Sequence, residues 1–78
     1  EGLDGINTAV GYENLTDYYF DLACNQVNSD TKMEFLSLAK FYVKETIRIF
    51  TKLFGSAHPR IVTATSHLAD IERQLLEA

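Results

Sequence analysis

The chain has few of the residues that build disulfide frameworks, metal sites and membrane spans. Its 78 residues include one cysteine, Cys24, which excludes an internal disulfide and any cysteine-based zinc site built by this chain alone. No apolar run approaches the roughly 20 residues that a membrane-spanning helix needs, and no signal-peptide pattern opens the sequence. We therefore expect a small intracellular, cytoplasmic domain that binds no metal, uses no cofactor and does not insert into a membrane.

Catalytic motifs are also missing. The sequence contains no glycine-rich phosphate loop, no paired carboxylates in an apolar setting, and no nucleophile beside a suitable base. Neither His58 nor His67 lies at a metal-ligand spacing from the other or from Cys24. The formal net charge of −4 makes the whole chain a poor nucleic-acid ligand. The sequence therefore predicts a protein that is not an enzyme.

The charge is divided unevenly between the two halves of the chain. Residues 1–39 carry seven acidic side chains and one basic one, whereas residues 40–78 carry six basic and four acidic ones. The halves therefore have net charges of −6 and +2. Such a split favours antiparallel contact between the halves, and it also allows copies of the chain to self-associate. Both interpretations stay open, and internal pairing is the simpler one.

Apolar residues recur at spacings of three and four along most of the chain, which is typical of amphipathic helices. No stretch shows the alternation of a strand, so the sequence predicts a single all-α domain over residues 1–78. The expected boundaries are a flexible lead-in at 1–7 and helices at about 8–26, 30–54 and 59–77.

The helix boundaries rest on capping residues. Asn7 can cap the first helix, because its side-chain oxygen can accept a hydrogen bond from an amide of the first turn. Thr31 and Glu34 have the spacing of a capping box at the start of the second helix, although Ser29 or Asp30 could equally hold that cap.

The end of the second helix is marked by Gly55, which suits a left-handed C-terminal cap. Pro59 then restarts the chain, since the missing amide proton of proline would be unpaired in a first helical turn anyway.

Each predicted helix has an apolar face that must be buried. Cys24 lies on or near the first of these faces, where it is expected to be a small buried hydrophobe. The faces consist of Tyr12, Leu15, Tyr19, Leu22 and Ala23 in the first helix, of Met33, Leu36, Ala39, Val43, Ile47, Phe50 and Phe54 in the second, and of Ile61, Ala64, Leu68, Ile71 and Leu75 in the third.

The stretch Leu38–Pro59, with the sequence LAKFYVKETIRIFTKLFGSAHP, resembles the second helix and linker of a tetratricopeptide repeat of the kinesin-light-chain type. Residues 61–69 resemble the first helix of a following repeat. The resemblance implies a helix-turn-helix arrangement in which the small residues Ala39 and Ala69 let helices approach closely. It also implies a structural role for His58 in the turn. A closed three-helix bundle is the alternative architecture.

The same resemblance implies a protein-interaction module, since tetratricopeptide domains commonly bind acidic peptides or C-terminal carboxylates in a concave groove. Two alternatives remain open. The chain could be a structural subunit that completes a larger complex. It could also be a regulatory helical segment of a MYND-type methyltransferase, because the C-terminal helical region of those enzymes carries a similar turn.

Two groups of side chains are predicted to contact a protein or peptide partner. The first is a basic ridge with a cation at every fourth position of the second helix, although a plain solvated face is the alternative interpretation. The second consists of aromatic residues off the apolar faces, where exposed rings in so small a domain indicate a contact surface. The basic ridge comprises Lys40, Lys44, Arg48 and Lys52, and the aromatic residues are Tyr18, Phe20 and Phe41.

Overall fold

The structure of the protein is a computed structural model that describes residues 5–77, and this part of the chain forms three α-helices. They are α1 (Ile6–Cys24), α2 (Ser29–Phe54) and α3 (Pro59–Glu77). The all-α class predicted from the sequence is therefore confirmed. Most of the predicted lead-in, residues 1–4, lies outside the described residues.

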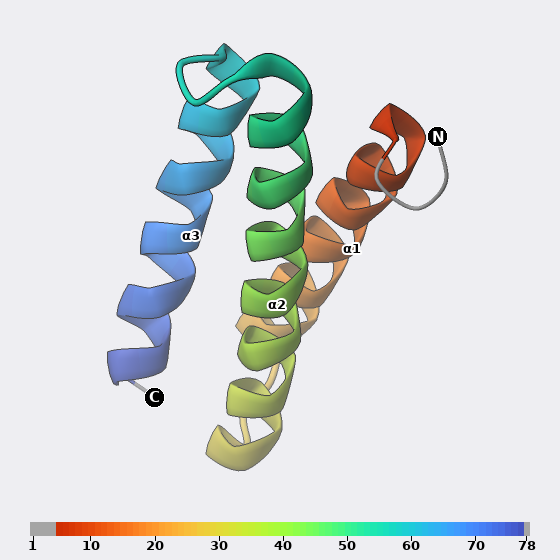
Figure 1. Cartoon of the computed structure of the whole chain (residues 1–78). Coiled ribbons are helices and arrows are strands. Elements are labelled where there is room, and N and C mark those ends of the chain that lie inside the picture. Colours follow the sequence, from red (N-terminus) through yellow and green to blue (C-terminus); the bar gives the residue numbers. More distant parts are fainter. Residues whose placement is uncertain (1–4, 78) are drawn as a thin grey trace.

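The central element of the fold is α2, which lies between the other two helices (Figure 1). It packs against both neighbours, and more extensively against α1 than against α3. In a closed bundle α1 and α3 would also pack along their lengths. Within residues 5–77 these two helices meet through a few side chains, so the arrangement is more open than a closed bundle.

The first helix begins and ends two residues earlier than predicted. Gly5 holds the N-cap position without any side-chain cap, and Asn7 is already inside the helix, so the predicted Asn7 cap is wrong. At the other end, the side-chain amides of Asn25 and Gln26 donate to backbone carbonyls four residues back, at 3.0 and 3.2 Å. These bonds supply donors to carbonyls of the last turn, where the Leu22 carbonyl also accepts from the Asn25 amide at 3.3 Å, and the helix ends at Cys24.

The second helix is capped by Asn28, so the predicted caps at Thr31, Ser29 and Asp30 are wrong. The Asn28 backbone is extended, and its Oδ1 atom accepts hydrogen bonds from the amides of Asp30 and Thr31 at 2.8 and 3.1 Å. Asn28 can do so because it precedes the first helical residue, whereas the Thr31 backbone already belongs to the helix.

Loss of this cap should be measurable. The substitution Asn28→Ala is expected to lower the free energy of unfolding by about 1 kcal/mol, because two amides lose their acceptor. Urea unfolding followed by circular dichroism measures the change. The control is Thr31→Ala, which removes the hydroxyl predicted from the sequence to be the cap and should cost less than about 0.5 kcal/mol. Equal losses in the two variants would contradict the assignment.

The core consists of two clusters arranged along α2, and Ile47 packs against both of them. Each cluster contains residues from all three helices, so neither α1 nor α3 has a core without α2. One cluster contains Ala23, Leu36, Ala39, Val43, Ala64 and Ile71, and the other contains Ala9, Ile49, Phe50 and Ile61.

Several residues that were predicted to be buried lie at the surface. Met33 and Phe54 are exposed near the two ends of α2. Cys24 is exposed because it falls outside the contact with α2, and Ala23 takes the buried position. Ala69 is exposed as well, so it does not mediate a close approach of helices.

Two threonines are fully or almost fully buried in the helix contacts. The hydroxyl of Thr16 donates to the carbonyl of Tyr12 at 2.8 Å, and that of Thr46 donates to the carbonyl of Tyr42 at 3.0 Å. Within residues 5–77 no buried side-chain nitrogen or oxygen lacks a hydrogen-bond partner. These local bonds offset the cost of burying a hydroxyl, so a small polar residue can occupy a close helix contact.

Candidate functional site

The four cations of the basic ridge differ in their surroundings. Lys44 and Lys52 are exposed on α2. Lys40 is half-buried, and its Nζ atom lies 3.6 Å from Oε2 of Glu72 on α3. Lys40 therefore belongs to the contact between α2 and α3 rather than to an open surface.

Arg48 is exposed and forms an ion pair within α2. Its Nη2 atom donates to Oε1 of Glu45 at 2.9 Å, one turn back along the helix. An exposed pair of this kind contributes a few tenths of a kcal/mol, because water and salt screen it. A guanidinium also has five N–H donors, so its contact with Glu45 is compatible with a second carboxylate.

The three predicted aromatic residues do not share one environment. The side chains of Tyr18 and Phe41 are 57% and 56% exposed, as predicted. Phe20 is half-buried instead, with its ring edge-to-face against His67 of α3 at a centroid distance of 5.0 Å. Its predicted exposure is wrong because it assumed an isolated helix, whereas α3 covers this side of α1.

The exposed rings of Tyr18 and Phe41 are the ends of a continuous row of aromatic side chains. Tyr18 contacts Tyr19, Tyr19 stacks on Tyr42 across the α1–α2 contact, and Tyr42 contacts Phe41. The successive centroid distances are 5.2, 5.7 and 5.3 Å. We call Tyr18, Tyr19, Tyr42 and Phe41 the aromatic row. Its half-buried middle, Tyr19 and Tyr42, contacts the two exposed rings on different helices.

The turn between α2 and α3 contains Gly55, His58 and Pro59. Gly55 has φ 85° and ψ 165°, a conformation that is essentially restricted to glycine but differs from the predicted left-handed cap. The Nδ1 atom of His58 accepts a hydrogen bond from the amide of Arg60 at 3.2 Å, and its ring stacks on Phe54 at 4.5 Å. Pro59 is the first residue of α3. These contacts hold the turn together.

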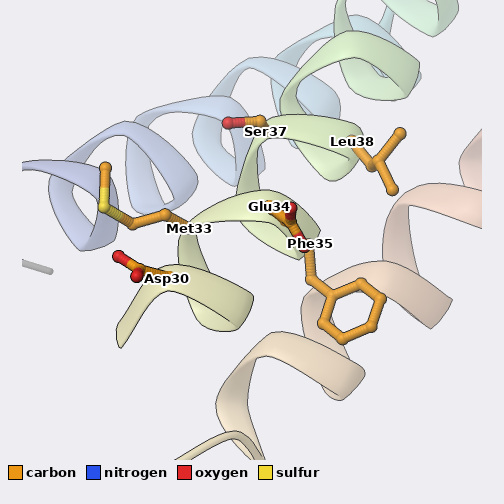
Figure 2. Close-up of a pocket in the computed structure, with 6 residues that line it drawn as sticks. All are labelled: Asp30, Met33, Glu34, Phe35, Ser37 and Leu38. Atoms are coloured by element: carbon orange, nitrogen blue, oxygen red, sulfur yellow. The ribbon is translucent and has the colours of Figure 1, made fainter. Parts of the chain in front are cut away.

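An open recess of about 720 Å³ lies on the N-terminal half of α2. Figure 2 shows Phe35 and Leu38 on the side of α1, and Met33 on the opposite side of the helix. Two carboxylates, those of Asp30 and Glu34, also line this recess, and no cation does. The surface is therefore both apolar and negatively charged. Nothing in the helical period indicated a recess here, because Met33 was placed on the buried face.

Sequence reasoning also missed the contacts between α1 and α3. Nδ1 of His67 lies 3.5 Å from Oδ1 of Asp17, and Nη1 of Arg60 donates to Oε1 of Glu13 at 3.1 Å. The Arg60 pair joins the acidic and basic halves, as the charge division suggested, but that division did not identify the partners. The guanidinium of Arg60 also lies over the ring of Phe50, 5.4 Å from its centroid. The His67 and Arg60 contacts therefore join α1 to α3.

No helix within residues 5–77 has the length and apolar character to cross a membrane. In the same part of the chain, no three histidine, cysteine or acidic side chains come together as metal ligands would.

Comparison with known proteins gives no assignment. No protein-family model, no curated protein and no solved structure matches the chain.

Proposed function

We propose that the chain is a non-catalytic protein-interaction module that binds an acidic, partly apolar peptide or partner helix on the outer face of α2. The observation that carries this proposal is the position of Phe41. Its ring is 56% exposed, and it precedes Lys44 and Arg48 by three and seven residues. These spacings put an aromatic side chain and two cations on one side of the helix.

This combination is suited to an acidic amphipathic segment. Aromatic and arginine side chains supply a large part of the binding energy at many protein interfaces. An arginine can also bind a carboxylate through two parallel hydrogen bonds. The aromatic row extends the surface to Tyr18 on α1, so that one partner segment can contact two helices at once.

The proposal keeps the resemblance to a tetratricopeptide helical hairpin as its architectural part. Three further observations support it: the long central helix, the glycine conformation at Gly55, and the contacts of His58 in the turn. An exposed free thiol at Cys24 also suits the reducing interior of a cell, where we place the protein.

A second candidate is a structural component whose exposed apolar side chains are covered in a larger assembly. The observation that favours it is on α3, where Val62 and Leu76 are 59% and 89% exposed. With Ala69 they are spaced by seven residues, so they lie on one side of the helix. A regulatory segment of a MYND-type methyltransferase would be one case of this kind.

The leading proposal can be tested with a labelled peptide. The probe is an amphipathic helical peptide with glutamates on its polar face and leucine and phenylalanine on its apolar face. Fluorescence anisotropy measures its affinity for the wild-type chain and for Lys44→Glu/Arg48→Glu. We expect the double variant to bind at least about tenfold more weakly, a loss of about 1.4 kcal/mol, because two attractive charges become repulsive.

Two controls make the result specific. The first is Arg73→Glu on α3, since Arg73 is also exposed and forms the same kind of pair, with Asp70 at 2.7 Å. This variant should bind like the wild type. The second is a peptide with glutamine in place of each glutamate, which should bind weakly to every variant. Equal losses in the α2 and α3 variants would reject a specific site on α2.

A further inference from the structure

The outer face of α2 carries its charges in a defined order. Asp30 and Glu34 are in the first two turns, Phe41 is near the middle, and Arg48 and Lys52 are in the last two turns. All five side chains are exposed. Their spacings are four, seven, seven and four residues, and each such step returns to nearly the same side of an α-helix. The five residues therefore form one line along the helix, which we call the α2 line.

The α2 line is symmetric about Phe41, with opposite charges at equal separations. Glu34 and Arg48 are each seven residues from Phe41, and Asp30 and Lys52 are each eleven residues from it. A second copy turned by 180° about an axis through Phe41 would place its cations opposite these carboxylates. We propose that two copies of the chain form a dimer through antiparallel packing of their α2 lines, with the two-fold axis at Phe41.

The recess on the N-terminal half of α2 suits this arrangement. Its volume is about 720 Å³, and its lining combines the apolar Met33 and Leu38 with the carboxylates of Asp30 and Glu34. In the antiparallel dimer, the basic half of the second α2 covers the recess. The methylene groups of long cationic side chains can then cover the apolar lining while their charged ends meet the carboxylates.

The remaining positions along the two helices contain no clash of like charges. Lys44 falls opposite Leu38, and Glu45 falls opposite Ser37, because each pair is equidistant from Phe41. The α2 line is also accessible, since it lies on the side of the helix opposite the core. A 26-residue helix is about 39 Å long, and the longest dimension of the molecule is 39 Å. The contact between the two copies can therefore run along the full length of α2.

The expected dimer is weak and sensitive to salt. One helix pair buries less surface than the roughly 1,600 Å² of a standard stable interface. The cross-dimer ion pairs are near solvent, so added salt screens them. The existing pair between Arg48 and Glu45 is also exposed, and its loss or sharing costs little. Association is therefore expected at micromolar or higher concentration.

The dimer goes beyond the proposed peptide binding and does not depend on it. Both would use Phe41 and Arg48, so an acidic peptide and a second copy would compete for the same surface. The two proposals are tested separately, because the dimer is measured with the purified chain alone. The peptide experiment is performed at chain concentrations where sedimentation shows a monomer.

The main test exchanges charges across the two-fold axis. Glu34→Arg places two arginines opposite each other, and Arg48→Glu places two glutamates opposite each other. By sedimentation equilibrium, each variant alone should dimerise at least about tenfold more weakly than the wild type. In an equimolar mixture one copy presents two arginines and the other presents two glutamates at these positions. A heterodimer of about wild-type affinity should therefore form.

The mixture also controls for misfolding, because two misfolded variants would not form a dimer when they are combined. A further control, Arg73→Glu on α3, should dimerise like the wild type. The proposal is overturned if the wild type stays monomeric at every concentration tested, if both single variants still dimerise normally, or if the mixture stays monomeric.

Cross-linking tests the antiparallel register. In a Cys24→Ser background, Phe41→Cys places two thiols at the two-fold axis, and oxidised glutathione should join them in a disulfide. Ser37→Cys is the matched control, since its two copies would be about 12 Å apart along the helices, too far for a disulfide. A parallel dimer would cross-link at both positions, so equal cross-linking would reject the antiparallel arrangement.

Discussion

Replacing Phe50 by alanine is expected to lower the free energy of unfolding by about 3–5 kcal/mol. Phe50 is fully buried in the cluster that joins α2 to Ala9 of α1 and Ile61 of α3. Its ring also contacts Phe54, at a centroid distance of 5.7 Å, and lies beneath the guanidinium of Arg60. A domain of this size has a total stability of about 4–12 kcal/mol, so Phe50→Ala removes a large part of it.

Urea unfolding followed by circular dichroism measures this loss. The matched control is Phe41→Ala, which makes the same deletion at an exposed position of the same helix and should cost less than about 1 kcal/mol. Both variants are measured at low concentration, so that association of copies does not contribute. Similar losses of unfolding free energy in the Phe50 and Phe41 variants would contradict the assignment of Phe50 as buried and Phe41 as exposed.

The second large effect is expected from a larger side chain at a helix contact. Ala39 of α2 is fully buried in one cluster with Ala23 of α1 and Ala64 of α3. Because Ala39 is fully buried in a cluster that contains residues from all three helices, its surroundings have little space for added atoms. Ala39→Leu is therefore expected to destabilise the fold by about 1–3 kcal/mol, because the added atoms force the helices apart or strain their side chains.

The control for this substitution is Ala69→Leu. Both residues were predicted to mediate close helix contacts, but Ala69 is exposed on α3. Alanine and leucine both favour helices, so Ala69→Leu should change the free energy of unfolding by less than about 0.5 kcal/mol. Thermal and urea unfolding of the two variants measure the difference. A loss at Ala69 as large as that at Ala39 would require a helix contact that this fold does not contain.

The sequence by itself determined the number and type of the helices. Its apolar periodicity, together with the turn and capping residues at the helix ends, placed α2 and α3 within one residue of their observed boundaries. The capping residues at the starts of α1 and α2 were less predictable, because several residues near each start could cap the helix. Asn28, rather than one of its neighbours, is the N-cap of α2 because of the path of the preceding turn. Periodicity does not describe that path.

For the candidate site, the sequence correctly identified the exposed rings of Tyr18 and Phe41. It could not find that Lys40 pairs with Glu72, or that α3 covers Phe20. The aromatic row and the recess on α2 were not predicted either, because both depend on how separate helices or neighbouring turns come together.

These features could not be predicted because periodicity shows which side of a helix is apolar, but not where the neighbouring helices end. The charge order on α2 follows from the sequence, since a helix fixes the spacing of its own residues. The outward direction of Phe41, Arg48 and Lys52 also followed from the sequence, and the tertiary structure showed that Asp30 and Glu34 are exposed with them. Long-range packing decided the surroundings of Cys24, Ala69 and Phe20, and the expectations drawn from the sequence for these three residues were wrong.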